Sequence, residues 1–185
     1  MRGGVRGSAR RPCYSAGYAT ARNPMSNDTL QLLASSAGLA LRDKGLLLAT
    51  AESCTGGGVA AAITDIAGSS EWFECGLVTY SNAAKTELLG VPPELIASHG
   101  AVSEEVAGAM ARGALGASNA TVAVSTTGIA GPGGAVPGKP VGTVCFGWAN
   151  EDSVHTERHQ FDGDRQAVRA QAVAHALQGL LRFIR

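Results

Sequence analysis

Hydrophobic residues recur with a helical period near both ends of residues 27–185. In residues 27–45 they are spaced as on one face of a helix, at Leu30, Leu33, Ala37, Ala40 and Leu41. In residues 164–183 the same spacing is found at Val168, Ala172, Ala176 and Leu180. Gly45 follows the first pattern, at a position where glycine commonly ends a helix. The pattern therefore predicts a helix at each end of this part of the chain.

Short apolar runs between these two helices predict strands. Residues 46–51 and 120–125 are continuous runs, which are typical of strands buried on both faces. Residues 72–81 predict another strand, and residues 141–149 and 154–161 predict an antiparallel pair around a turn.

Further helices are expected between these strands, over residues 57–66, 83–89 and 103–115, with a short one that begins at Pro92 and Pro93. Ser103 is well suited to cap the helix that follows it. The resulting order of elements predicts an α/β fold, specifically a three-layer α/β/α domain with a mixed sheet.

The first residues differ in composition from the rest. They contain five arginines and no acidic residue up to Met25, at Arg2, Arg6, Arg10, Arg11 and Arg22. Such a composition is found in transit peptides, and equally in a disordered tail or in a segment upstream of a later start at Met25. We expect a disordered, Arg-rich extension over residues 1–26 and a single domain over residues 27–185.

Charge and composition exclude several classes of partner. The chain has 15 Lys and Arg residues against 15 Asp and Glu residues, so no strong net field draws it to nucleic acid or to an anionic membrane. No apolar run approaches the ~20 residues that a membrane-spanning helix requires. We therefore expect neither nucleic acid nor a membrane as a partner.

Cysteines and histidines are scattered. The four cysteines form no CxxC pair, which favours free thiols in a reducing compartment and hence a cytoplasmic protein. His155 and His159 are four residues apart, as two metal ligands on a helix would be, but their segment has the pattern of a strand. No metal site is expected.

Ser53 is the first candidate for chemistry. It follows a predicted buried strand and precedes Gly56-Gly57-Gly58, so it lies at the carboxyl end of a strand, where α/β domains place their sites. Backbone N–H groups at the start of the next helix can bind a phosphate or an oxyanion. The alternative is that Ser53 and Thr55 only cap this helix.

Lys85 is the candidate base. A serine hydroxyl needs a group that takes its proton, and a lysine can do so if burial lowers its pKa. The alternative is an ordinary solvated lysine on a helix.

Two further segments could bind a ligand. The loop that contains Gly128 and Gly131 follows a buried strand, and its glycines allow a ligand to approach the backbone, unless it is only a flexible connector. Arg165 begins the last helix and could hold a phosphate through two N–H groups, or pair with Asp164 or Asp162 at the surface.

Seven segments, taken together in this order, resemble the CinA carboxy-terminal domain family. They are residues 50–57 (Thr-Ala-Glu-Ser-Cys-Thr-Gly-Gly), 66–70, 78–82 with Lys85, 100–104, 128–132, 139–143 and 163–165 (Gly-Asp-Arg). The resemblance covers about residues 28–183. Residues 131–139 depart from the family pattern, with Gly133, Val136 and Gly138 where relatives often have polar or acidic residues.

The resemblance implies an activity and a site. Stand-alone members of the family hydrolyse the carboxamide of nicotinamide mononucleotide to nicotinic acid mononucleotide and ammonia, through a serine–lysine pair without metal or cofactor, and are often homo-oligomers. The implied catalytic residues are Ser53, Lys85 and Tyr80. The residues expected to bind substrate are Ser70, Thr127, Arg165, Thr55, Gly56, Gly128 and Gly131.

Two other functions are compatible with the same residues. The first is a nucleotide-binding module without catalysis, linked to competence or DNA damage, in which helix starts and glycine loops only hold an anion. The second is a serine–lysine amidase that acts on a different small amide.

Overall fold

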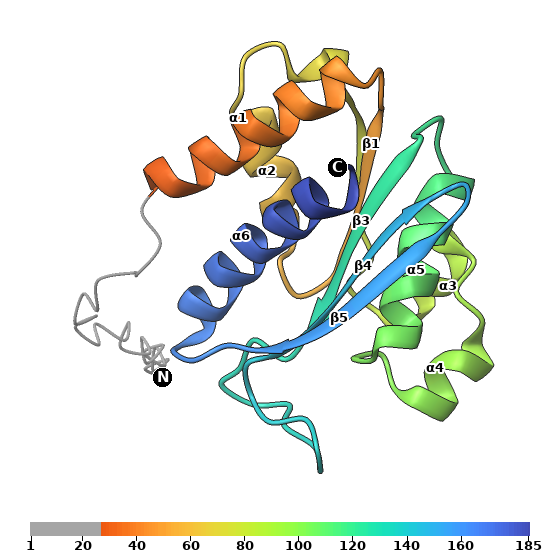
Figure 1. Ribbon diagram of the computed structural model, residues 1–185. Helices are drawn as coiled ribbons and strands as arrows, with labels where there is room; N and C mark the ends of the chain where they lie inside the picture. Colours follow the sequence, from red (N-terminus) through yellow and green to blue (C-terminus); the bar gives the residue numbers. More distant parts are fainter. Residues whose placement is uncertain (1–26) are drawn as a thin grey trace, which may run out of the picture.

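The computed structural model describes residues 27–185, so the expected extension over residues 1–26 lies outside the described residues. The helices are α1 (Asn27–Asp43), α2 (Gly58–Thr64), α3 (Asn82–Leu89), α4 (Pro93–His99), α5 (Glu104–Gly116) and α6 (Arg165–Phe183), with a 3₁₀ turn η1 (Ser69–Glu71). The strands are β1 (Leu48–Glu52), β2 (Phe73–Val78), β3 (Val122–Gly128), β4 (Thr143–Asn150) and β5 (Val154–Gln160). This order agrees with the order that the hydrophobic pattern predicts (Figure 1).

The sheet has five strands in the order β2-β1-β3-β4-β5. β1 runs parallel to β2 and β3, whereas β4 and β5 are antiparallel. The predicted mixed sheet is therefore confirmed. Because β1, β2 and β3 are parallel, the segments that follow them emerge at the same edge of the sheet, where α/β domains bind ligands.

Helices cover both faces of the sheet (Figure 1). α1, α2 and α6 pack on one face, against Leu48, Val124 and Phe146. α4 and α5 pack on the other face, where the strands present the small side chains of Ala49 and Ala123. These layers confirm the three-layer α/β/α prediction.

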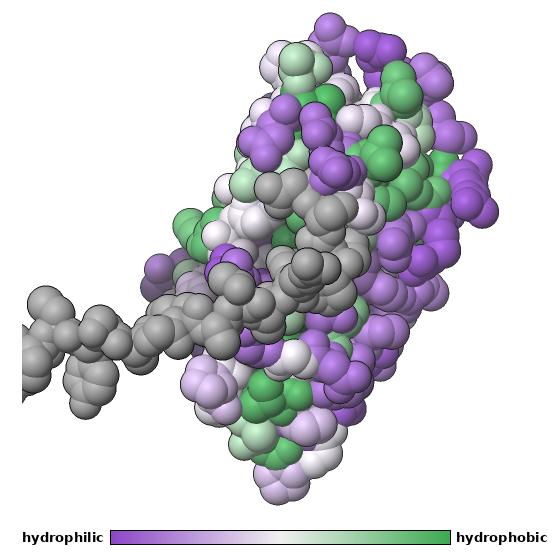
Figure 2. Space-filling view, turned by 90° about the vertical axis from the view of Figure 1, so that its left-hand side faces the viewer, coloured by the Kyte–Doolittle hydropathy of each residue, from purple (hydrophilic) through white to green (hydrophobic). Residues whose placement is uncertain are grey.

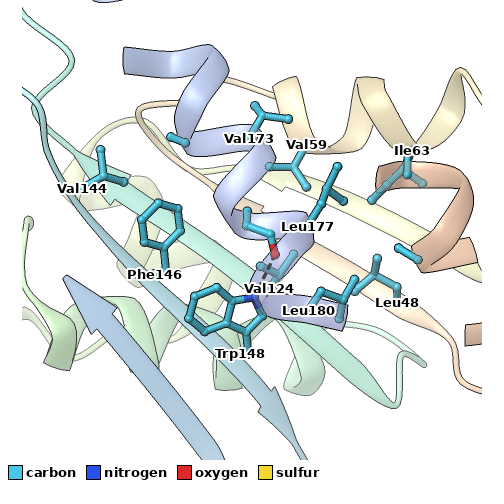
Figure 3. Packing of buried hydrophobic residues seen from close by; sticks show 14 of the residues in the cluster. Leu48, Val59, Ile63, Val124, Val144, Phe146, Trp148, Val173, Leu177 and Leu180 are labelled. Atoms are coloured by element: carbon cyan, nitrogen blue, oxygen red, sulfur yellow. Dashed lines mark hydrogen bonds between the residues drawn. The ribbon is translucent and has the colours of Figure 1, made fainter. Parts of the chain in front are cut away.

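Trp148 on β4 is the largest fully buried side chain between the sheet and helices α1, α2 and α6. Its indole N–H donates a 3.0 Å hydrogen bond to the carbonyl oxygen of Ala176 on α6 (Figure 3). Burying an indole is favourable only when its polar N–H finds such a partner. The contact ties α6 to β4.

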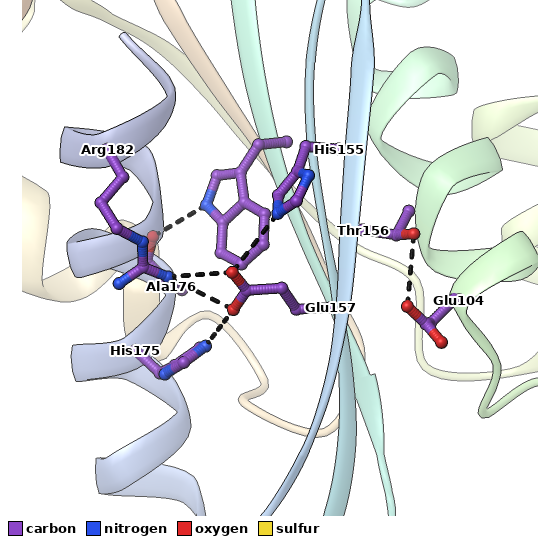
Figure 4. A network of polar contacts seen from close by, with 8 residues as sticks. Glu104, His155, Thr156, Glu157, His175, Ala176 and Arg182 are labelled. Atoms are coloured by element: carbon purple, nitrogen blue, oxygen red, sulfur yellow. Dashed lines mark hydrogen bonds and ion pairs between the residues drawn. The ribbon is translucent and has the colours of Figure 1, made fainter. Parts of the chain in front are cut away.

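A network of polar side chains also connects the edge strand β5 to α6 (Figure 4). The Glu157 carboxylate lies 2.7 Å from the ring of His175 and 3.2 Å from the guanidinium of Arg182, both on α6. His155 lies 3.3 Å from the same carboxylate. His155 and His159 are thus on a strand, as the sequence pattern predicts.

Hydrophobic side chains form separate patches between hydrophilic ones on the face that Figure 2 shows, outside the part that grey atoms cover. Among residues 27–185, no helix combines the length and the apolar character needed to cross a membrane.

Candidate active site

Ser53 begins the turn that joins β1 to α2. Its N–H donates to the carbonyl oxygen of Thr126 at 2.9 Å, so the pairing of β1 with β3 continues to this residue. The chain then turns through Gly56 and Gly57, whose φ angles of 59° and 90° favour glycine. The sequence thus places the Ser53 hydroxyl at the carboxyl edge of the sheet.

Glu52 stabilises this turn through hydrogen bonds. Its side chain is a carboxylate, yet only 1% of its surface is exposed. Its two oxygens accept hydrogen bonds from the N–H groups of Ala60 at 2.8 Å and of Val59 at 3.1 Å, in the first turn of α2. The hydroxyl of Thr55 donates to it at 2.6 Å. The positive end of a helix favours a negative charge at this position.

Lys85 meets Ser53 from α3. Ser81 caps this helix by accepting a 3.0 Å hydrogen bond from the N–H of Ala84. Only 1% of Lys85 is exposed, and its amine lies 3.0 Å from Oγ of Ser53 and 2.8 Å from the carbonyl oxygen of Thr79. Burial lowers the pKa of Lys85 from its ordinary value. The solvated-lysine alternative is therefore wrong.

Arg165 connects the segments that follow β2 and β3. One guanidinium nitrogen donates to the carbonyl oxygen of Gly131 at 2.8 Å, and the other donates to the hydroxyl of Tyr80 at 3.1 Å. Gly131 follows β3 and Tyr80 follows β2, and β1 lies between these strands. The carboxylate of Asp164 caps α6 instead of pairing with Arg165.

These side chains surround a pocket of about 220 Å³. Six of the predicted residues line it, namely Ser53, Tyr80, Lys85, Thr127, Gly128 and Arg165. Thr127 and Gly128 belong to β3, which continues past the predicted end at residue 125. The Thr127 hydroxyl donates to the carbonyl oxygen of Ala101 at 2.7 Å, which ties β3 to the segment before α5.

Other predicted residues are placed differently. The Thr55 hydroxyl is buried against Glu52 and lies 2.7 Å from Oγ1 of Thr126. Gly56 is exposed in the turn, and the carbonyl of Gly131 is occupied by Arg165. Ser70 belongs to η1, which precedes β2, so it lies at the opposite edge of the sheet from Ser53. Tyr80 is 63% exposed, and its hydroxyl contacts Arg165.

Cys54, Asn82 and Glu52 are site residues that the sequence patterns do not single out. Cys54 and Asn82 line the pocket. Burial raises the pKa of the Cys54 thiol to about 12, so it is neutral and does not compete with Ser53 as a nucleophile. An acidic residue at the end of an apolar run, directly before a glycine-rich helix start, is the available signal for Glu52.

Comparisons with known proteins show the family of this chain. The sequence model of the CinA C-terminal domain matches residues 30–184. The chain is 56% identical over 156 residues to nicotinamide-nucleotide amidohydrolase PncC of Pseudomonas putida, covering 84% of this chain and 98% of the relative. It is 55% identical over 157 residues to the enzyme of the same name from Escherichia coli K12, covering 84% and 95%.

Solved structures have the same fold. The competence/damage-inducible protein CihA from Agrobacterium tumefaciens superposes with a TM-score of 0.82 at 42% identity, covering 85% of this chain and 96% of that one. A CinA superfamily protein from Escherichia coli gives a TM-score of 0.82 at 38% identity, covering 86% and 92%. This chain therefore belongs to the CinA C-terminal domain family.

Proposed function

We propose that this chain is a nicotinamide-nucleotide amidohydrolase, which converts nicotinamide mononucleotide to nicotinic acid mononucleotide and ammonia. Relatives that bear this enzyme name support the proposal, at 55% to 57% identity. The single observation that carries it is the 3.0 Å distance between the Lys85 amine and the Ser53 hydroxyl inside a pocket. A serine becomes a nucleophile when a group at this distance takes its proton.

Acylation is the first half of the proposed reaction. Neutral Lys85 takes the proton from Oγ of Ser53, and the oxygen attacks the carboxamide carbon of the substrate. The tetrahedral intermediate then collapses. The C–N bond breaks, and the Lys85 ammonium gives its proton to the leaving nitrogen. Ammonia departs, and the nicotinoyl group remains bound to Ser53 as an ester.

Hydrolysis of this ester is the second half. Lys85, again neutral, takes a proton from a water molecule that attacks the ester carbon. The Ser53 oxygen leaves and recovers its proton from Lys85. The carbonyl oxygen of Thr79, 2.8 Å from the amine, accepts a hydrogen bond from Lys85 and so holds the base in place through both halves.

Backbone N–H groups of the turn are the proposed oxyanion donors. The N–H of Gly56 already donates to the carbonyl of Ser53 at 3.1 Å. We therefore assign the role to the other N–H groups of the Cys54–Gly57 turn, which follows the nucleophile. Removing one oxyanion donor typically costs a factor of ~10²–10³ in rate.

The other predicted site residues are proposed to bind the substrate or to shape the backbone around the pocket. Arg165, Thr127 and Gly128, which line the pocket, are proposed to hold the nucleotide. Tyr80 stays a predicted catalytic residue, and its hydroxyl accepts a hydrogen bond from Arg165. Thr55, Gly56 and Gly131 act through the turn and the loop that they form. Ser70, in η1 before β2, does not line the pocket, so this proposal assigns it no contact with the substrate. The proposed mechanism requires no metal or cofactor. That the protein is cytoplasmic and forms a homo-oligomer stays a prediction.

Ammonia release from nicotinamide mononucleotide tests the proposal. We expect release by the unmodified protein and a loss of about 10³-fold or more in kcat for Ser53→Ala. Ser98→Ala, an exposed serine on α4, is the matched control. No release by the unmodified protein would support a non-catalytic module, and full activity of Ser53→Ala would exclude Ser53 as the nucleophile. Faster release from nicotinamide or from another small amide would change the assigned substrate.

A further inference from the structure

α6 contacts the segments that follow all three parallel strands, through two arginines one helical turn apart. Arg165 binds Gly131 after β3 and Tyr80 after β2. Arg169 donates to the carbonyl oxygen of Thr55, in the turn after β1, at 2.8 Å. Residues four apart share one face of a helix, so both guanidinium groups lie on the side of α6 that faces the site.

Both charges are uncompensated. Among residues 27–185, no carboxylate lies within ion-pair distance of Arg165 or Arg169, and the groups that they bind are neutral oxygens. A guanidinium has five N–H donors, so each arginine has donors to spare beyond the bonds described. Arginine with free donors is the residue that proteins most often use for bidentate phosphate binding.

Gly56 leaves the surface beside Arg169 open. It is exposed, and a Cβ atom at this position would lie 3.4 Å from Nη2 of Arg169. A larger side chain would therefore cover or displace the guanidinium. Arg169 itself is half-buried, and glycine at position 56 places no side chain over its guanidinium.

The pocket alone is too small for the whole proposed substrate. Its volume is about 220 Å³, whereas pockets for drug-sized ligands usually measure ~300–1,000 Å³. A substrate whose carboxamide reacts at Ser53 would place its pyridine ring in the pocket and its ribose phosphate at the rim. Arg165 forms part of that rim.

We propose that Arg169 is a second phosphate-binding residue beside Arg165, and that the pair makes this protein select a nucleotide over the corresponding nucleoside. The proposal deepens the proposed function and rests on it for the identity of the ligand. It differs from a purely structural role of Arg169, in which the residue only holds Thr55 and the turn of Ser53.

Binding measurements on an inactive protein test this proposal. Calorimetry compares Ser53→Ala with Ser53→Ala/Arg169→Gln, using nicotinamide mononucleotide and nicotinamide riboside as ligands. Loss of a hydrogen-bonded charge predicts about tenfold or more weaker binding of the mononucleotide. Binding of the riboside, which has no phosphate, should stay within about twofold. Arg182→Gln in the same background is the control, because Arg182 is on α6 but binds Glu157.

The outcomes are distinct. Equal weakening of both ligands would overturn the proposal in favour of the structural role, and so would unchanged binding of the mononucleotide. If Arg169→Gln does not fold, Arg169→Lys keeps the charge, and a partial loss limited to the mononucleotide is expected. Failure of the amidohydrolase proposal is seen separately, as absence of ammonia release by the unmodified protein that still binds the mononucleotide.

Discussion

The amine of Lys85 and the hydroxyl of Ser53 lie 3.0 Å apart, although 32 residues separate them in the chain. The contact brings the first turn of α3 to the end of β1. Because the lysine is 1% exposed, water does not stabilise its charged form, and the pKa of Lys85 is lowered. Two measurable consequences of this burial follow, one for catalysis and one for stability.

Activity should depend on the neutral form of Lys85. We expect kcat/KM to rise as the pH increases through the Lys85 pKa, which burial places below its ordinary value of 10.5, and to fall toward acidic pH. Steady-state rates of ammonia release at closely spaced pH values, with unfolding measured at each pH, provide the test. A profile that stays flat down to about pH 4 would reject Lys85 as the base.

Stability should depend on the same proton. The folded-state pKa of Lys85 is lower than 10.5, so between these two pKa values the unfolded chain binds more protons than the folded chain. The contribution of Lys85 to the free energy of unfolding should therefore rise with pH across this window, whereas the buried Cys54 and Cys145 thiols, whose pKa values are raised, contribute in the opposite direction. Lys85→Met should remove that rise when urea unfolding is measured at several pH values. Lys44→Met, at an exposed lysine, should keep it.

Hydrophobic patterning alone predicts most of the fold, because buried strands and amphipathic helices here follow their usual periods. Its main error is the end of β3. The pattern ends this strand at residue 125, because Thr126 and Thr127 are polar, yet both are buried and pair with Phe146 and Cys145 on β4. Their pairing depends on a partner strand that a local pattern does not contain.

The sequence predicts the site less well than the fold. Position at the end of a strand indicates Ser53. The need of a serine for a base makes Lys85 a candidate, but only the family resemblance favours it over a solvated lysine, since no local pattern shows that α3 turns this side chain inward. Arg169 shows the same limit. Its i, i+4 relation to Arg165 is visible in the sequence, whereas its contact with the carbonyl of Thr55 depends on how α6 packs.

Glu52 should be important for stability as a carboxylate. Its two oxygens bind the N–H groups of Val59 and Ala60, and glutamine has only one acceptor oxygen for them. Glu52→Gln therefore leaves one N–H unpaired in a buried site, which typically costs about 1–3 kcal/mol. Urea unfolding measures this loss. Glu94→Gln, at an exposed position in the first turn of α4, should change the free energy of unfolding by less than about 0.5 kcal/mol. Equal effects of the two substitutions would contradict the assignment.

Close packing of α6 on β4 requires a glycine at position 179. A Cβ atom there would lie 2.0 Å from Cζ2 of Trp148, whose ring is fully buried and held by its bond to Ala176. The ring cannot move without breaking that bond, so Gly179→Ala should destabilise the protein by about 1–3 kcal/mol, as overpacking typically does. Gly116→Ala is the matched control, because nothing lies within 4 Å of its Cβ position at the end of α5. Alanine favours helix over glycine by up to about 1 kcal/mol, so the control should unfold at an equal or higher temperature. Thermal unfolding that shifts both variants in the same direction would show that α6 does not pack this closely on Trp148.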